Sequence, residues 1–533
     1  MNLAPEAPVL HLFLDRHLES GRGDALAIRT PGASYSYSDL EALVNRAGNL
    51  LRGLGVQPEQ RVALLLPDGI ELVATFLGAI KIGAVAVPLN TRLTAGDYRV
   101  MLRDSRARVL VAEASFAPLV DDLAGQVPWL TAVLMVGQPP STRYPRFHDL
   151  LKDAQPRLEP TPLTQDDMAF WLYTSGTTGR PKAAVHPRRT LQACRYYGLD
   201  VLGVSEQDRI FATSKLFFAY ALGNALLIPL CARAQTYLHP AWADPTLIAS
   251  VLRDFQPTLF FSVPTLYARL LRADLPPATF RSVRLCVSAG ERLPAELYTA
   301  WEQRFGVPIL DGIGATETVF MFLSNRPDQR RAGSSGLPVP GSEARILDAE
   351  GREVPTGEQG VLWVKTPSAA AGYWNRLDLT RQTFVGEWYR TRDVYVRDAD
   401  GFYYHRGRED DWFKVAAMWV NPVDVEQACL EHPGVLEAGV VGAEDEGGLV
   451  KPFLFVLPRD PTAEAEPLVR ELEAWLGQRL ASHQRPKRIV VVPELPRTAT
   501  GKLQRFQLRE QVRRLLQPHP ESSALQPGTG DRG

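Results

Sequence analysis

Short apolar runs alternate with amphipathic segments through much of the chain, and this alternation restricts the fold more than any other feature. Buried strands are predicted at residues 61–66, 84–89 and 107–112, with a helical pattern over residues 70–80 between the first two. Strands that are apolar on both faces belong in a parallel sheet with helices on each side. The repeat therefore predicts a doubly wound α/β subdomain.

The alternation returns further along and then gives way to another pattern. Strands expected at residues 259–263, 285–288 and 308–311 predict a second doubly wound subdomain, in which ligands lie beyond the carboxyl ends of the strands. Residues 334–402 combine short strands with Gly and Asp turns, which predicts a small β-barrel-like subdomain. Together these segments predict a large N-terminal domain over residues 1–407.

A separate module with an α+β pattern is predicted over residues 408–515. Helices are expected at residues 422–431 and 468–480, and strands at residues 435–441 and 453–456. A small domain that folds by itself is therefore expected after the large one.

Several local features make specific predictions. Ser38 is expected to cap a helix that runs to Leu51, and residues 312–317 are expected to form a Gly-bearing loop at the sheet edge. Residues 414–420 are expected to form a strand. Residues 516–533 are rich in Pro, Ser and Gly, which predicts a disordered tail.

Composition excludes several classes of protein. The chain has 59 basic and 60 acidic residues, so no overall field favours nucleic acid or an anionic membrane. Its four cysteines are scattered without a CxxC pair, which predicts buried thiols and neither a disulfide framework nor a zinc site. We see no signal-peptide pattern, and Lys81 interrupts the most apolar region, residues 72–89. A cytoplasmic enzyme is expected.

A loop rich in hydroxyl groups follows the apolar run at residues 168–173. Its glycines allow the backbone to turn tightly and point N–H groups at an anion, while hydroxyls and an ammonium group add donors and positive charge. The loop residues that would bind phosphate are Thr174, Ser175, Gly176, Thr177, Thr178, Gly179 and Lys182. The spacing is not that of a P-loop, and composition alone would favour a polar surface turn.

The amino-acid sequence of this loop resembles the phosphate-binding signature of the adenylate-forming superfamily, which includes acyl-CoA and aryl-CoA ligases. The likeness runs from about Tyr35 to about Phe506. Three further segments are especially similar to benzoate-CoA ligases: residues 215–220, 311–314 and 498–506. The resemblance implies a large adenylation domain and a small mobile C-terminal lid.

The implied reaction is the attack of a carboxylate on the α-phosphate of ATP, which expels pyrophosphate, followed by transfer of the acyl group to a thiol. Because this step crowds two anions together, positive charge and fixed donors must offset them. The resemblance places Glu317 on Mg²⁺ and the phosphates, Thr316 on the α-phosphate, and Lys502 between the carboxylate and the phosphate. Taken singly, Glu317 is typical of a solvated helix start, and Lys502 of a solvated loop.

Further nucleotide contacts are implied by the same resemblance. Asp393 would accept the ribose hydroxyls, and Arg408 would contact the nucleotide. Adenine would lie against the backbone of Ala289, Gly290 and Glu291, with Asp311, Gly312 and Ile313 at its edge and face. Asp393 would otherwise be a surface-turn residue, and Arg392 beside it stands where many relatives have Gly.

The implied acyl site combines an aromatic gate with small residues, which favours an aromatic ring over a long aliphatic chain. Phe218 is the gate and is counted with the catalytic residues; core packing is its alternative interpretation. The other acyl-site residues are Ala219, Tyr220, Gly312, Gly314, Ala315 and Phe320, where glycines are expected to leave flat slots. Phe320 stands where benzoate-CoA ligases tend to have His, so benzoate, aminobenzoates such as anthranilate, and hydroxybenzoates all remain open.

For the second half-reaction, the resemblance implies that the lid rotates about Asp410. Lys414, Ala416 and Ala417 would border the passage for CoA, and Ala417 replaces a usual Gly. The predicted function is an ATP- and Mg²⁺-dependent aryl-CoA ligase that acts as a monomer or homodimer on a small aromatic carboxylate. Two alternatives stay open: an enzyme that loads the aryl group onto a separate carrier protein, and a nucleotide-binding regulatory protein without catalysis.

Overall fold

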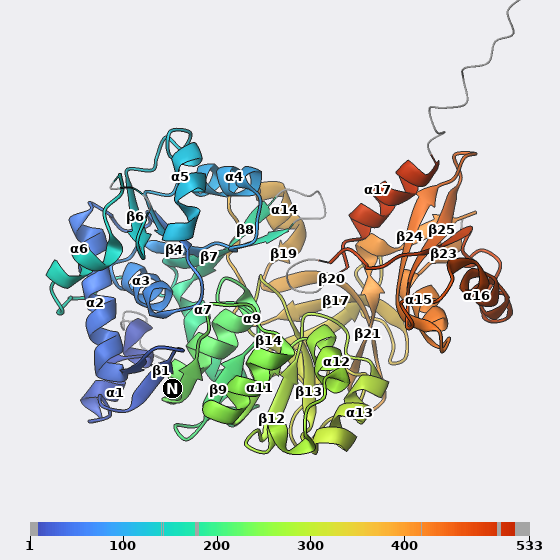
Figure 1. Ribbon diagram of the computed structural model, residues 1–533, viewed down its shortest axis with the longest axis horizontal. Coiled ribbons are helices and arrows are strands. Elements are labelled where there is room, and N and C mark those ends of the chain that lie inside the picture. Colours follow the sequence, from blue (N-terminus) through green and yellow to red (C-terminus); the bar gives the residue numbers. More distant parts are fainter. Residues whose placement is uncertain are drawn as a thin grey trace, which may run out of the picture. The chain divides into compact units, whose positions relative to one another are not determined.

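The computed structural model describes residues 9–139, 141, 143–175, 181–416, 418–497 and 503–516. By its internal contacts the chain divides into two compact units, Met1–His405 and Arg406–Gly533. Figure 1 shows the elements of each unit in chain order.

The first unit contains a seven-stranded sheet that is parallel at its centre. From edge to edge its strands are β18 (Gly372–Tyr373), β8 (Pro181–Pro187), β7 (Met168–Ser175), β4 (Val85–Pro88), β3 (Arg61–Leu65), β5 (Val109–Glu113) and β6 (Ala132–Val136). Strands β7, β4, β3, β5 and β6 pair in parallel, whereas β8 runs antiparallel to β7. The predicted strands near residues 61, 84 and 107 are confirmed.

A nine-stranded sheet lies in the same unit. From edge to edge its strands are β15 (Leu337–Pro338), β14 (Met321–Ser324), β13 (Ile309–Gly314), β12 (Leu285–Ser288), β11 (Leu259–Ser262), β9 (Arg209–Ala212), β10 (Gln235–Tyr237), β1 (Leu26–Arg29) and β2 (Ser34–Ser36). The neighbours β9, β11, β12 and β13 pair in parallel, as the second run of predicted strands requires.

Helices cover both faces of both sheets, and one helical layer is shared between them. The shared layer contains α2 (Tyr37–Gly53), α3 (Ile70–Lys81), α7 (Arg188–Gln192), α8 (Cys194–Gly198), the π-helical turn η3 (Leu222–Leu227) and α10 (Ile228–Ala232). The outer helices are α4 (Ala95–Ser105) and α5 (Ala117–Ala124) on the first sheet, and α11 (Pro245–Asp254), α12 (Pro264–Arg272) and α13 (Ala295–Phe305) on the second (Figure 1).

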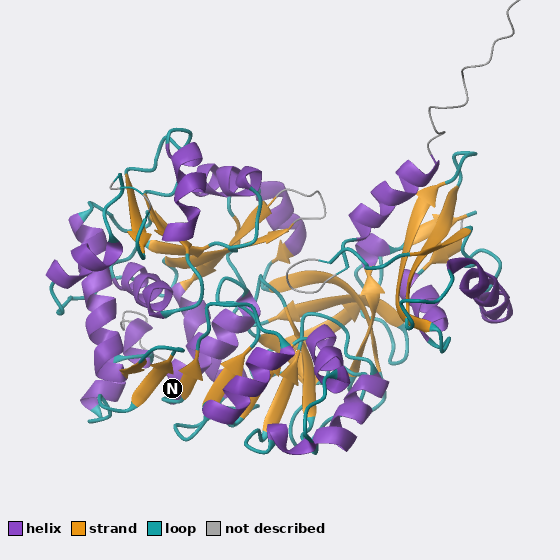
Figure 2. Cartoon of the chain, viewed as in Figure 1, coloured by secondary structure: helices purple, strands orange, loops and turns teal. Residues whose placement is uncertain are grey.

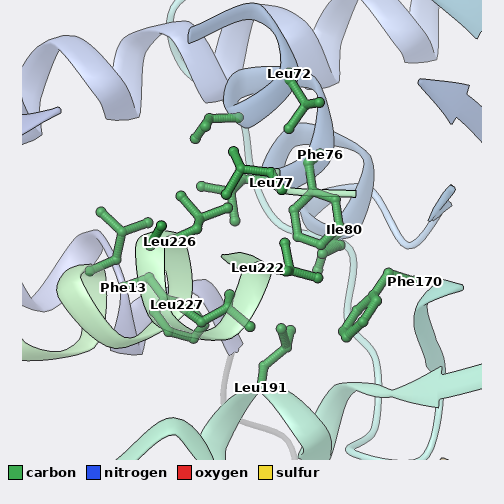
Figure 3. Close-up of a cluster of buried hydrophobic side chains, with 14 of the residues drawn as sticks. Phe13, Leu72, Phe76, Leu77, Ile80, Phe170, Leu191, Leu222, Leu226 and Leu227 are labelled. Atoms are coloured by element: carbon green, nitrogen blue, oxygen red, sulfur yellow. The ribbon is translucent and has the colours of Figure 1, made fainter. Parts of the chain in front are cut away.

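Strand side chains divide between these layers by simple alternation. Phe261 of β11 packs in the shared core, whereas its neighbour Phe260 packs against the outer helices, because successive strand residues point to opposite faces. Figure 3 shows the shared core, where Phe76 and Leu77 of α3 lie close to Leu222. This largely apolar layer fixes η3, and therefore also residues 218–221 before it.

A third, antiparallel sheet completes the first unit and corresponds to the predicted small β subdomain. Its strands follow the order β16 (Glu343–Leu347), β17 (Gln359–Lys365), β20 (Trp388–Arg397) and β19 (Phe384–Val385), with β21 (Tyr403–Arg408) also paired to β20. The remaining helices of this unit are α1 (Asp15–Glu19), α6 (Phe147–Asp153), α9 (Ala219–Ala221) and α14 (Leu377–Thr383).

The second unit has the predicted α+β pattern. Figure 2 shows its helices in purple and its strands in orange. Its three-stranded sheet has the order β24 (Val435–Glu444), β25 (Val450–Pro458) and β26 (Arg488–Val491). The helices are α15 (Pro422–Leu430), α16 (Ala465–Arg479) and α17 (Arg505–Leu516), and a hairpin is formed by β22 (Phe413–Val415) and β23 (Met418–Val420).

Three local predictions are wrong. Ser36 caps α2 in place of Ser38: its hydroxyl accepts a hydrogen bond from the Asp39 N–H, and the Asp39 carboxylate accepts one from the Ser36 N–H, which forms a capping box. Gly312 and Gly314 lie in β13, since β14 pairs with that strand and extends it beyond the sheet edge. Residues 414–420 form a hairpin, because the chain reverses where Ala416 takes a φ of 47°.

All four cysteines are buried free thiols, as predicted. Within the described ranges, no helix combines the length and the apolar character that are needed to cross a membrane.

Candidate active site

The hydroxyl-rich loop connects two antiparallel strands. Thr174 of β7 pairs with Lys182 of β8, so the chain turns back on itself between them. Gly176, Thr177, Thr178 and Gly179 lie outside the described residues, as does the side chain of Ser175. The structure therefore shows which strands carry the loop and where its lysine lies.

Glu317 is the centre of a buried polar cluster beside this hairpin. Its Oε1 accepts a hydrogen bond of 2.5 Å from the Tyr373 hydroxyl and lies 3.4 Å from Nζ of Lys182. Lys182 Nζ also donates to the Tyr373 hydroxyl over 2.7 Å, and the Tyr389 hydroxyl lies 3.4 Å from Oε2. Three strands, β8, β18 and β20, thus supply the partners of one carboxylate.

The cluster keeps Glu317 ionised. Burial by itself would raise the pKa of the Glu317 carboxyl, but the charge of Lys182 and the Tyr373 hydroxyl outweigh burial and hold the pKa below its ordinary value. A buried carboxylate beside an ammonium group provides fixed charges of both signs. Such an arrangement can orient a phosphate chain and a cation that travels with it.

His186 supports the backbone next to Glu317. It lies on β8, stacks on Phe170 with ring centroids 4.8 Å apart, and its Nε2 is 2.9 Å from the Thr316 carbonyl oxygen. Burial lowers the pKa of His186 to about 4, and its Nδ1 has no hydrogen-bond partner among the described residues. The neutral ring therefore donates from Nε2 and holds Thr316 in place.

Replacing His186 with Phe is expected to flatten the dependence of stability on pH. Because the folded pKa is near 4 and the ordinary value is 6.5, the unfolded chain takes up a proton between these values that the folded chain does not. The wild type should therefore lose about 3 kcal/mol of unfolding free energy from this residue as pH falls from 6.5 to 4. Urea unfolding of both proteins at several pH values measures the difference.

His17 provides an internal check, because burial lowers its pKa to about 4 as well. It titrates in both proteins, so its contribution cancels when the two pH profiles are subtracted. Parallel profiles for wild type and His186→Phe would contradict the expectation.

Several residues expected to bind the nucleoside lie in β13 and in the turn after β12. Ser288, the last residue of β12, is the register partner of Asp311 within β13, and Ala289 and Gly290 follow Ser288 directly. Burial raises the pKa of Asp311 well above its ordinary value, and its Oδ1 has no hydrogen-bond partner within the described part of the chain. A buried acceptor that lacks a partner beside the end of β12 suits a donor such as an exocyclic amine.

Asp393 lies on β20 in the antiparallel sheet. Its Oδ1 is 3.5 Å from Nε2 of His405, and its backbone N–H donates to the Thr391 hydroxyl over 3.0 Å. Arg392 takes a φ of 64°, a left-handed conformation that glycine adopts without strain. Arg392 therefore holds a backbone conformation that L-residues with side chains rarely adopt.

The residues expected to bind the acyl group include Phe218, Ala219 and Tyr220, which form the acyl segment. Phe218 directly precedes α9. The Tyr220 hydroxyl lies 3.1 Å from the Ser262 carbonyl oxygen and 3.0 Å from that of Val287, so it ties α9 to the ends of β11 and β12. Phe320 packs over Gly223, where an added Cβ would lie 3.1 Å from two ring carbons of the phenylalanine. The Phe320 ring therefore lies against η3, and the Tyr220 hydroxyl lies at the ends of β11 and β12.

The flat slots expected at two glycines are wrong. A Cβ added at Gly312 would lie 2.8 Å from the Leu323 carbonyl oxygen, and one at Gly314 would lie 2.8 Å from that of Phe320. The backbone of β14 already fills the space that a side chain would take. These glycines therefore serve the close approach of β13 and β14.

The second unit carries the remaining predicted residues. Arg408 and Asp410 approach each other, with NH2 and Oδ2 3.8 Å apart. In the β22–β23 hairpin, the Lys414 ammonium lies 4.7 Å from the ring centroid of Trp419, and Trp419 is 56% exposed. Lys502 and Ala417 lie outside the described residues.

Comparison with known families decides the assignment. Residues 14–374 match the family model for AMP-binding enzymes, and residues 424–502 match the model for the AMP-binding enzyme C-terminal domain. The chain belongs to the AMP-binding enzyme family.

Similar proteins cover almost the whole of this AMP-binding enzyme. The benzoate-CoA ligase of Thauera aromatica is 43% identical over 501 residues, 93% of this chain and 94% of that protein. The anthranilate-CoA ligase of Pseudomonas aeruginosa is 38% identical over 88% of this chain and 89% of that protein. The crystal structure of the anthranilate CoA ligase AuaEII with anthranoyl-AMP matches with a TM-score of 0.90 and 39% identity, covering 96% of this chain and 98% of that one.

Sequence reasoning missed Tyr373, Tyr389 and His186 of this AMP-binding enzyme. All three surround Thr316 and Glu317, but they come from strands that are distant in the chain. The pattern of β8 gave a weak signal, since a His within the buried run at the end of this strand needs a partner. Nothing in the sequence pattern pairs β18 with β8.

Proposed function

We propose that this AMP-binding enzyme is an ATP-dependent aryl-CoA ligase that activates a benzoate-type acid. The observation that carries the proposal is the ionised, buried Glu317, which is held by Lys182 and Tyr373 beside the hydroxyl-rich hairpin. The names of the relatives support the choice of substrate, because they include benzoate and anthranilate ligases. The products would be aryl-CoA, AMP and pyrophosphate.

Each of the site residues would have its own role in the adenylation step. The hairpin between β7 and β8 would bind the leaving phosphates, with Thr316 on the α-phosphate. Asp393 would hold the ribose, and the open Oδ1 of Asp311 would accept a hydrogen bond from the adenine amine. Lys502 on the lid would bridge the attacking carboxylate and the α-phosphate, where its charge offsets two anions.

Mg²⁺ fits this site as a companion of the nucleotide. The described residues contain no group of three or more side chains that could hold a metal by themselves. A single buried carboxylate beside bound phosphates is nevertheless the usual setting for Mg²⁺, which keeps much of its coordination to phosphate and water. Glu317 would hold the ion, which would supply positive charge to the phosphates.

The thiol would reach the acyl carbon after a rotation of the lid domain, residues 408–515, about Asp410. The β22–β23 hairpin, with Lys414 and Ala416, would then border the passage for CoA. A hinge residue must change its backbone dihedral angles while the domains on either side stay intact. Rotation would withdraw Lys502 after the first step and make room for the thiol.

An aromatic acid fits the acyl residues better than a long aliphatic chain. Phe218, Tyr220 and Phe320 present rings, and the Phe320 ring occupies the space over Gly223. A flat ring packs between such groups without the entropy loss of ordering a flexible chain. Benzoate, anthranilate and hydroxybenzoate are the acids to be compared.

Product analysis tests the proposal. The protein, ATP, Mg²⁺ and each of the three acids are combined with CoA, and the products are identified by mass spectrometry, with ATP omitted as the control. Aryl-CoA with AMP is expected for at least one acid. If aryl-AMP accumulates without aryl-CoA at millimolar CoA, the enzyme loads a carrier protein instead, and if neither forms, the catalytic assignment fails.

A further inference from the structure

A buried lysine lies just before the acyl segment. Lys215 is only 4% exposed, and its Nζ donates to the carbonyl oxygens of His239 and Ala241 over 2.6 Å each. The same ammonium lies 3.9 Å from Oδ2 of Asp68, which is 5% exposed. One cation therefore joins three segments that are far apart in the chain.

These bonds continue into the turn that carries Phe218. Oδ1 of Asp68 accepts a hydrogen bond of 2.9 Å from the backbone N–H of Leu216, and the N–H of Phe218 donates to the Lys215 carbonyl oxygen over 2.8 Å. The turn is thus fixed at Lys215, Leu216 and Phe218. The position of this turn is set by the Lys215–Asp68 pair, because the turn itself belongs to no helix or strand.

The third segment packs on the gate itself. Trp242 follows the residues that accept the bonds of Lys215, and its ring centroid lies 6.4 Å from that of Phe218. The Arg92 guanidinium lies 4.1 Å from the Trp242 ring centroid on another side. Lys215 therefore fixes both Phe218 and the ring that Phe218 packs against.

Burying this pair costs free energy of desolvation, and that cost exceeds what a surface ion pair would return. Burial lowers the pKa of Lys215 and raises the pKa of Asp68 to about 6, so each charge is held against its solvation preference. An apolar side chain of similar length would fill the space at a lower cost. The Lys215–Asp68 pair is therefore better explained by a role in positioning these segments than by a contribution to the folding free energy.

We propose that Lys215, with Asp68, is a positioning residue that sets the acyl site by holding Phe218 and Trp242 in register. The role rests on the proposed function, in which Phe218 contacts the aromatic acid. Loss of the ammonium would free the turn before α9 and the segment at residues 239–242, while the nucleotide site around Glu317 would keep its own contacts.

A matched pair of variants tests the proposal. Lys81 is also 4% exposed, donates to Asn45 Oδ1 over 2.8 Å and lies 3.9 Å from an Asp15 carboxylate oxygen, but it belongs to α3. Lys215→Met should raise the KM for the aromatic acid about tenfold, with the KM for ATP and kcat within about twofold of wild type. Lys81→Met should leave the KM for the acid unchanged.

Amide hydrogen exchange gives a readout that does not depend on the substrate assignment. Exchange over residues 215–222 should be faster in Lys215→Met than in wild type or Lys81→Met. Asp68→Asn, which keeps an oxygen for the Leu216 N–H, serves if Lys215→Met does not fold, and it should raise the same KM. An unchanged KM for the acid, an equal rise in the KM for ATP, or unchanged exchange over residues 215–222 would overturn the proposal.

Discussion

Replacing Glu317 with Gln is expected to lower acid-dependent ATP–pyrophosphate exchange by about 10²- to 10³-fold, the loss typical when one fixed electrostatic contact to a reacting phosphate or oxyanion is removed. Gln keeps the shape of the side chain and accepts a hydrogen bond from Tyr373, but it carries no charge. Lys182 then loses the anion 3.4 Å away, and the phosphate-bound cation loses its carboxylate. Exchange assays at saturating acid and ATP measure the effect.

The control is a glutamate of the same domain that also pairs with a lysine. Oε2 of Glu387 lies 2.9 Å from Nζ of Lys365, and both side chains are exposed, so the pair contributes little. Glu387→Gln should retain wild-type exchange. If Glu317→Gln folds, as judged by circular dichroism, and exchanges at the wild-type rate, the role assigned to Glu317 is wrong.

Replacing Lys502 with Ala is expected to separate the two half-reactions. Acid-dependent exchange should fall by about 10²- to 10³-fold, because no other side chain would bridge the carboxylate and the α-phosphate. Conversion of a supplied aryl adenylate to aryl-CoA should persist, since the rotated lid would no longer place this lysine at the reacting carbon. Pyrophosphate exchange and CoA consumption with synthetic aryl-AMP measure the two steps.

Lys487 provides the matched control for this variant. It is an exposed lysine of the same small unit, so Lys487→Ala makes the same chemical change on the protein surface. It should leave both half-reactions unchanged. Equal losses in both half-reactions for Lys502→Ala would show that the lysine supports the lid in general and not adenylation in particular.

The alternation of strands and helices and the short motifs predicted several of the parallel strands that the structure contains in the two α/β sheets. The strands near residues 61, 259 and 285 appear where apolar runs predict them, because a strand buried on both faces leaves few other arrangements for its backbone. The cap of α2 shows where such reasoning is weak. Ser36 and Ser38 are each followed three residues later by an acid, Asp39 and Glu41, so the sequence offers two capping boxes and the structure uses the first.

The glycines of β13 show a second weakness. Gly312 and Gly314 suggested open space, whereas the tertiary structure fills that space with the backbone of β14. A glycine in a sequence reports that a side chain is absent, but not what takes its place. Residues 414–420 show a third weakness, because no turn residue such as Gly, Pro, Asn or Asp marks the reversal that makes this predicted strand a hairpin.

The sequence by itself determined the order of strands and helices and the loop chemistry around Glu317 and Lys182, because local patterning and motif spacing are written along the chain. Only the tertiary structure decided which distant side chains surround them. Tyr373 reaches Glu317 because β18 pairs with β8, and Lys215 meets Asp68 and residues 239–241 because three segments converge. Such contacts depend on how strands pair and layers pack, and no local pattern in a single sequence encodes that pairing.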